Sequence, residues 1–155
     1  MHTLELLLRV LHIGFAATVI GAAIFQYFAV LPSLRTLPDA QRSELRESLA
    51  SRWRPWVFAA IAVLLITGLL NFVLFKVPAY RGAPNAGMYH MLFGLKLLLA
   101  LAVFHQATML VLSGRSGEKR REMPAGTFQV LLGLYAAIVV VAGVMRYFPQ
   151  FFQGR

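Results

Sequence analysis

Two polar side chains lie deep inside apolar runs, where each costs free energy unless it has a partner. His12 lies in the first run and Lys96 in the third. At a rise of 1.5 Å per residue, each is about 12 Å from the outer end of its run. Imidazole is the commonest metal ligand, and an amine at this depth can pair with an anion, a carbonyl group or a cofactor. We predict that His12 and Lys96 form one cofactor-binding site, although a structural histidine and a snorkelling lysine are the plainer interpretations.

Arg9 lies on the same helical face as His12, and Glu5 precedes it by four residues. Glu before Arg at this spacing is the favourable order for an ion pair. The pair marks the outer end of a helix, or it presents Arg9 to a carboxylate such as a haem propionate. We therefore include Arg9 among the candidate cofactor-binding residues.

A second candidate site is the cluster Met88, His90 and Met91, at the start of the third apolar run. Thioether and imidazole ligands together suit Cu(I), although methionine is also ordinary in a membrane helix. His105 follows Lys96 by nine residues, which puts the two on opposite faces of a helix. We expect His105 to make a hydrogen bond between helices rather than to share a cofactor with Lys96.

The remaining polar and small residues in the runs predict contacts between helices. Thr67, Asn71 and Gln26 are expected to hydrogen-bond across helices, and Ala17 with Gly21 and Gly133 with Ala137 to allow close packing. Arg146 is expected to be an interfacial anchor. The apolar runs contain no acidic residue, which argues against an ion-coupled transporter.

The elements that must position these residues are membrane helices. Of the 155 residues, 59% are apolar and 14% charged, whereas soluble domains have about 45–50% and about 25%. Four runs are long enough to cross a bilayer, and no alternation of period two favours a barrel. We predict an all-α fold, an integral membrane antiparallel four-helix bundle forming one domain over residues 1–155. Its spans are expected at about 6–31, 55–76, 88–112 and 125–147, with a short amphipathic surface helix over about 38–50 that Asp39 caps.

Charge predicts the orientation. The net charge is +9, and the basic residues concentrate in the first and third connecting segments: Arg35, Arg42, Arg46, Arg52, Arg54, Arg115, Lys119, Arg120 and Arg121. Fewer lie on the other side: Arg9, Lys76, Arg81, Arg146 and Arg155. The positive-inside rule then puts both termini outside a bacterial-type cytoplasmic (inner) membrane. The charge is thus explained by membrane topology, and no nucleic-acid partner is expected. The absence of cysteine excludes disulfides, thiolate metal sites and covalently attached c-type haem.

Three segments resemble the copper resistance protein D (CopD-like) family: LLLRVLHIGFAATVIGAAIF with AVLPSL, SRWRPWVFAAIAVLLITGLLNFVL, and MYHMLFGLKLLLALAVFHQATML. Together they cover roughly residues 4–112. His12 and Lys96 also resemble an essential His and Lys of the J-type protoporphyrinogen oxidase, a small four-helix protein in which a b-type haem is implicated.

These resemblances imply two functions. The first is copper handling at the outer face of the membrane, with Met88, His90 and Met91 as ligands. The second is a haem b redox protein with His12 as axial ligand and Lys96 as second ligand or nearby charge. Its propionate partners would be Arg9, Lys76, Arg81 or Arg146. The third alternative is a non-catalytic accessory subunit, so whether the chain is an enzyme stays open. Expected partners are the lipid bilayer and either a second copy of the chain or a larger membrane complex.

Overall fold

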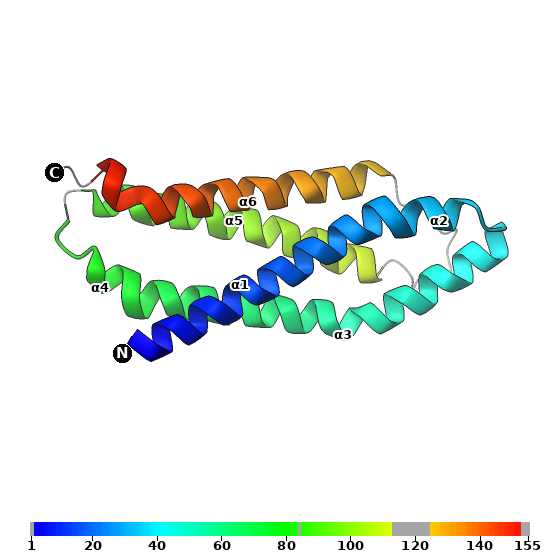
Figure 1. Cartoon of the computed structure of the whole chain (residues 1–155), viewed down its shortest axis with the longest axis horizontal. Coiled ribbons are helices and arrows are strands. Elements are labelled where there is room, and N and C mark those ends of the chain that lie inside the picture. The colour runs from blue at the N-terminus through cyan, green and yellow to red at the C-terminus, as the bar shows by residue number, and fades with distance from the viewer. Residues whose placement is uncertain (1, 84, 113–124, 153–155) are drawn as a thin grey trace.

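The computed structural model describes residues 2–83, 85–112 and 125–152, and this part of the chain is helical with no strand. The elements are α1 (His2–Phe25), η1 (Gln26–Val30), α2 (Leu31–Arg35), α3 (Asp39–Asn71), η2 (Phe72–Lys76), α4 (Val77–Ala79), α5 (Ala86–Leu112) and α6 (Ala125–Phe152) (Figure 1). The predicted all-α class is confirmed. The predicted membrane orientation rests in part on the basic residues at positions 115, 119–121 and 155, which lie outside the described residues.

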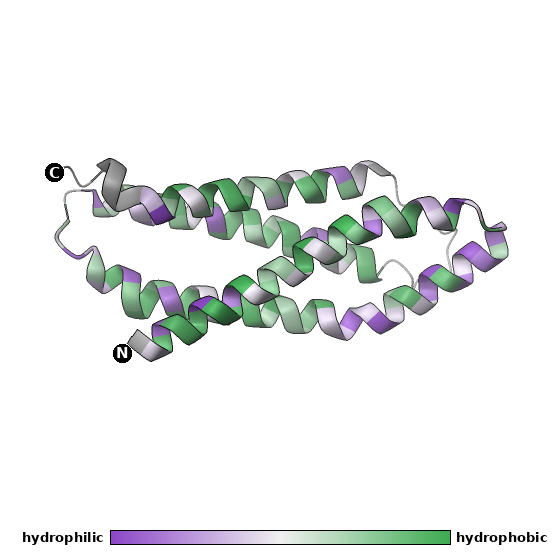
Figure 2. Cartoon of the chain, in the orientation of Figure 1, coloured by the Kyte–Doolittle hydropathy of each residue, from purple (hydrophilic) through white to green (hydrophobic). Residues whose placement is uncertain are grey.

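Four stretches of helix are long and apolar enough to cross a membrane: Thr3–Arg35, Asp39–Ala79, Ala86–Leu112 and Gly126–Tyr147. Each contains one of the apolar runs recognised in the sequence. Figure 2 shows hydrophobic residues along most of their length, with hydrophilic residues concentrated in the first half of α3. Many large apolar side chains point outward, including Phe28, Trp56 and Leu98, as expected of helices surrounded by an apolar medium.

The four long helices contact one another in a ring. α1 packs against α3, α3 against α5, α5 against α6, and α6 against α1. Figure 1 places both described ends of the chain and α4 at one end of the molecule, and the turn between α2 and α3 at the other. The buried core is divided into two clusters, one around Val103 and Tyr135 and the other around Tyr80 and Tyr89.

Both π-helical turns precede a proline. η1 ends before Pro32, and η2 ends before Pro78. Proline lacks an N–H group and its ring collides with the carbonyl four residues earlier, so a widened turn accommodates it while the chain stays helical. The additional residue in such a turn changes which way the following side chains point. In η2, Phe72 and Lys76 both face the interior.

The predicted separate surface helix over residues 38–50 is wrong. Asp39 begins α3, which continues without interruption through Pro55 to Asn71. The sequence between Asp39 and Pro55 contains no helix-breaking residue, so the polar segment extends the second membrane helix instead of leaving it. Asp39 is also not a cap: no side chain caps the N-terminus of α3, and the Asp39 carboxylate pairs with Arg42 at 3.1 Å.

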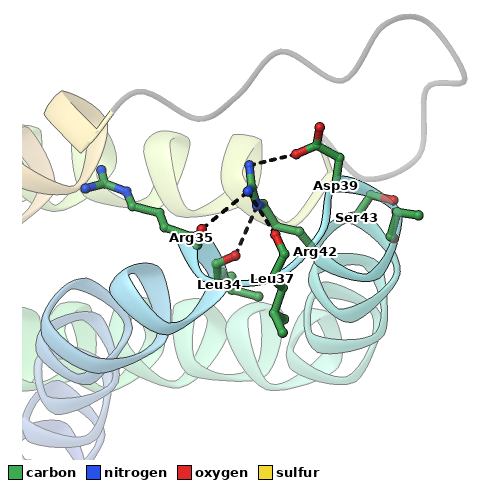
Figure 3. Close-up of polar contacts among 7 residues, drawn as sticks. Leu34, Arg35, Leu37, Asp39, Arg42 and Ser43 are labelled. Carbon is green, nitrogen blue, oxygen red and sulfur yellow. Dashed lines mark hydrogen bonds and ion pairs between the residues drawn. The ribbon is translucent and has the colours of Figure 1, made fainter.

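Arg42 closes the turn between α2 and α3 (Figure 3). Its guanidinium donates to the carbonyl oxygens of Leu34 at 3.0 Å, Leu37 at 3.0 Å and Arg35 at 3.4 Å. These carbonyls belong to the C-terminal end of α2 and the turn after it, where the helical N–H groups have ended. The Leu34 carbonyl also accepts the N–H of Leu37 at 3.3 Å. A cation there also interacts favourably with the negative end of the helix dipole. Arg42, which the charge pattern identified only as a topology signal, is therefore a structural cap.

We expect Arg42→Ala to lower the free energy of unfolding by about 1–2 kcal/mol, because it removes several hydrogen bonds from a charged donor. The measurement is thermal unfolding in detergent followed by circular dichroism. Arg52→Ala is the matched control, since Arg52 is exposed on α3, and it should unfold like the wild type. Equal stability of the two variants would contradict the capping role.

The prediction that the two small-residue pairs allow close packing is also wrong within this chain. A Cβ atom added at Gly21 or Gly133 would meet nothing within 4 Å, because both glycines face away from the neighbouring helices. Of the glycines that the structure describes, Gly68 alone lies close to another side chain, the ring of His12. The tight contact between α1 and α3 therefore occurs at a position that the small-residue pattern did not identify.

Candidate functional site

The four long helices line a partly open cavity of about 510 Å³, within the range of about 300–1,000 Å³ typical of small-molecule and cofactor sites. It reaches from the end of the molecule that carries α4 towards the core cluster around Val103. Its walls are mainly aliphatic and aromatic, and its polar lining residues come from α1, α3, η2, α5, α6 and the segment after α4: Arg9, His12, Asn71, Lys76, Tyr80, Tyr89, Lys96, Tyr135 and Arg146.

His12 projects from α1 against α3. Its Nδ1 lies 2.9 Å from Oγ1 of Thr67, and Thr67 is buried with 5% of its surface exposed. Gly68 follows Thr67, and a Cβ atom there would lie 3.1 Å from Cε1 of His12. The imidazole therefore lies directly against α3, where Gly68 has no side chain, and it also lines the cavity. The predicted interhelical hydrogen bond of Thr67 is confirmed, with His12 as its partner.

Lys96 lines the same cavity from α5. It is half-buried, and none of the hydrogen bonds and ion pairs within the described part of the chain includes it. Its neighbours on the same helical face, among them Phe93 and Ala100, also line the cavity. The structure thus brings His12 and Lys96 to one chamber, as their matching depths predicted. His105 is exposed and does not line the cavity, which confirms that Lys96 and His105 lie on different faces.

Cationic side chains surround the end of the cavity near α4. Glu5 accepts hydrogen bonds from Arg9 at 3.2 Å and from Lys76 at 3.1 Å, so the predicted pair of Glu5 and Arg9 is confirmed and extended to η2. Arg146, predicted to be an interfacial anchor, is exposed and also lines the cavity. Among the described residues that line the cavity, four are lysines or arginines and none is acidic. Glu5 offsets part of the charge of Arg9 and Lys76, and the net positive charge that is left favours an anionic ligand or an anionic end of a ligand.

Aromatic rings form the wall between this cationic end and the interior. Tyr80 stacks on Tyr89 with ring centroids 4.0 Å apart, and Phe72 stacks on Phe93 at 3.6 Å. Burial raises the pKa of Tyr80 above its usual range, so its hydroxyl stays protonated at neutral pH and can donate a hydrogen bond. Flat stacked rings of this kind suit a flat, largely apolar ligand.

The proposed copper ligands lie elsewhere. Met88, His90 and Met91 are all exposed on the first turns of α5, and none lines the cavity. The ring of His90 packs edge-on against Phe72 at 5.5 Å. Met88 and Met91 are three residues apart and share a face, whereas His90 points about 100° or more away from each. Their role in binding copper stays a prediction, and their geometry does not link them to His12 and Lys96.

Sequence reasoning did not identify the tyrosines of the lining, Tyr80, Tyr89 and Tyr135. Asn71, expected to hydrogen-bond across helices, lines the cavity. Gln26, expected to do the same, is half-buried in η1, where Gln129 of α6 donates to the hydroxyl of Tyr27 at 3.1 Å. Of the basic residues expected at a propionate, Arg81 does not line the cavity, whereas Lys76 does so from the π turn η2.

The cavity offers an imidazole and an amine at mid-depth, cations at one end, and apolar walls around both. This arrangement can hold an elongated or flat molecule that has an anionic edge and a centre to which a nitrogen atom can coordinate. No family model, curated protein or solved structure matches this chain.

Proposed function

We propose that the chain is an antiparallel four-helix membrane protein that binds a b-type haem in the cavity, with His12 as an iron ligand. The observation that supports the proposal is the convergence of His12 from α1 and Lys96 from α5 on one cavity. A histidine is a common axial ligand of haem iron. A charged residue inside a membrane span usually marks a functional site, and here the lysine faces the same chamber as the histidine.

The residues present fit a haem. The walls are aliphatic and aromatic, as a macrocycle requires, and Gly68 leaves room for the imidazole beside α3. Arg9, Lys76 and Arg146 line the cavity towards one end, where they would pair with the propionates through charge-assisted hydrogen bonds. Lys96 is then a second ligand or a charge close to the macrocycle.

A bound haem would supply one-electron redox chemistry. The chain's own residues would bind and orient it: His12 would hold the iron, the basic residues would hold the carboxylates, and the stacked aromatic rings would exclude water. Tyr80 and Tyr89 line the same cavity. The apolar surroundings would strengthen each of these electrostatic contacts.

We also propose that the cationic end of the cavity faces the outside of a bacterial-type cytoplasmic membrane. The turn between α2 and α3, with Arg35, Arg42 and Arg46, would then be cytoplasmic, following the positive-inside rule. Both termini would be outside. A C-terminal reporter that is active only in the cytoplasm would contradict this topology.

The test of the proposed function is an absorption spectrum and a metal analysis of the full chain, purified in detergent from haem-sufficient cells. A Soret band with reducible α and β bands, and about one iron per chain, is expected. Stoichiometric copper without a Soret band would instead support the cluster of Met88, His90 and Met91. Neither iron nor copper would favour an accessory subunit in a larger complex.

The cationic end provides a further prediction. We expect Lys76→Met to weaken haem binding by about tenfold, because a charge-assisted hydrogen bond is worth about 1.5–3 kcal/mol before screening. Arg81→Met is the matched control, since Arg81 is exposed nearby and does not line the cavity. Haem titration of the two apoproteins is the measurement. If both variants bind haem equally well, the propionates do not lie at Lys76.

A further inference from the structure

We propose that Thr67 is a positioning residue, which holds His12 as the tautomer with its proton on Nδ1 and its free lone pair on Nε2, directed into the cavity. This is the tautomer that can bind a metal centre through Nε2. The identity of that metal centre, haem iron, rests on the proposed function, whereas the tautomer does not.

The first step is to account for the proton of the Thr67 hydroxyl. Oγ1 of Thr67 lies 2.6 Å from the carbonyl oxygen of Val63 and 3.5 Å from that of Leu64. A carbonyl oxygen can only accept, and a hydroxyl has a single proton to donate. The short contact therefore assigns this proton to Val63, within the same helix, and leaves Oγ1 with lone pairs only.

The second step follows at His12. Nδ1 of His12 lies 2.9 Å from the same Oγ1. Since Oγ1 can now only accept, Nδ1 must be the donor and must carry a proton. A neutral imidazole has one N–H group and one free nitrogen, so Nε2 is unprotonated. The opposite tautomer would set two lone pairs against each other beside a buried threonine, where water does not compensate.

The third step concerns direction. The edge of the ring that holds Nδ1 and Cε1 lies against α3, at Thr67 and Gly68. The opposite edge, with Nε2 and Cδ2, points away from Thr67 and Gly68, and His12 is one of the residues that line the cavity. Thr67 and Gly68 thus act together: the hydroxyl selects the tautomer, and the missing side chain lets the ring lie close enough to receive it. Such partners of a metal-binding histidine commonly fix its orientation.

The experiment measures the tautomer directly in the full chain without haem. The protein is labelled with ¹⁵N-histidine, and the His12 signal is identified as the one absent from His12→Gln. We expect protonated Nδ1 in the wild type, a shift toward protonated Nε2 in Thr67→Val, and the wild-type pattern in Thr67→Ser, which keeps the hydroxyl. A wild-type His12 protonated on Nε2, or an unchanged tautomer in Thr67→Val, would overturn the proposal.

Haem binding gives a second readout. Thr67→Val should bind haem about 10–100-fold more weakly, the usual effect of removing such a partner, whereas Thr67→Ser should stay close to the wild type. Equal affinities of Thr67→Val and wild type would overturn the positioning role. If the wild type binds no haem but shows the expected tautomers, the proposed function fails and the positioning of His12 stands. The wild-type tautomer is read without Thr67→Val, so a poorly folded Thr67→Val does not remove the test.

Discussion

His12→Ala is expected to purify without a Soret band, under conditions in which the wild-type chain retains haem. The imidazole is the only histidine side chain among the described residues that lines the cavity, so its removal deletes the nitrogen ligand that the proposal requires. Loss of an iron ligand should lower haem retention by about 100-fold or more, since the loss of a group that only hydrogen-bonds to such a ligand costs about 10–100-fold. The measurement is the ratio of Soret to protein absorbance after purification.

The controls separate loss of the ligand from loss of the fold. His105→Ala removes a histidine that is exposed on α5 and does not line the cavity, and it should keep the full spectrum. Imidazole added to His12→Ala should partly restore haem binding, because the truncated side chain leaves a space of the same shape. If His12→Ala retains haem while His90→Ala loses bound copper, the exposed cluster on α5 is the site and the proposed function is wrong.

Lys96→Met is expected to change stability and haem binding in opposite directions. In the chain without haem, Lys96 is an amine without a protein partner among the described residues, half-buried between apolar helices. Replacing it with an apolar side chain of similar length should leave the melting temperature unchanged or raise it, because the desolvation cost disappears. With haem, the loss of a ligand or charge should weaken binding by about tenfold or more.

The matched control for Lys96→Met is Leu95→Met, one residue earlier on the outward face of α5. It should change neither haem binding nor melting temperature by much. The double variant His12→Ala with Lys96→Met should lose little more haem than His12→Ala alone, because side chains that act on one ligand are not additive. A lower melting temperature of apo Lys96→Met together with normal haem binding would show that the lysine has a structural role.

Much of this architecture could be predicted from the sequence, because the length of each apolar run decides by itself where a long helix forms. A run of about 20 apolar residues forms a helix in lipid, since each backbone polar group must be satisfied within the segment. The four helices therefore followed from composition alone. The pair of Glu5 and Arg9, and the opposite faces of Lys96 and His105, followed from helical periodicity.

Helix boundaries at prolines could not be predicted in the same way. The first two spans were expected at about 6–31 and 55–76, next to Pro32, Pro55 and Pro78. All three prolines lie within longer helical stretches, and π turns precede Pro32 and Pro78. Whether a proline breaks a helix depends on how neighbouring segments satisfy the freed carbonyl groups. That is a property of the tertiary environment, and it decided the length of α3 and the direction of Lys76.

The sequence by itself determined which residues had to be explained: a histidine and a lysine at the same depth, each too costly to leave in lipid without a partner. Only the tertiary structure decided what they meet. The contact between Thr67 and His12 joins positions 55 residues apart, and the pairing of Glu5 with Lys76 joins positions 71 apart. No local periodicity encodes such distances, because they depend on how α1 packs against α3 and η2. That packing makes Gly68 a site of close approach and Thr67 the partner of His12.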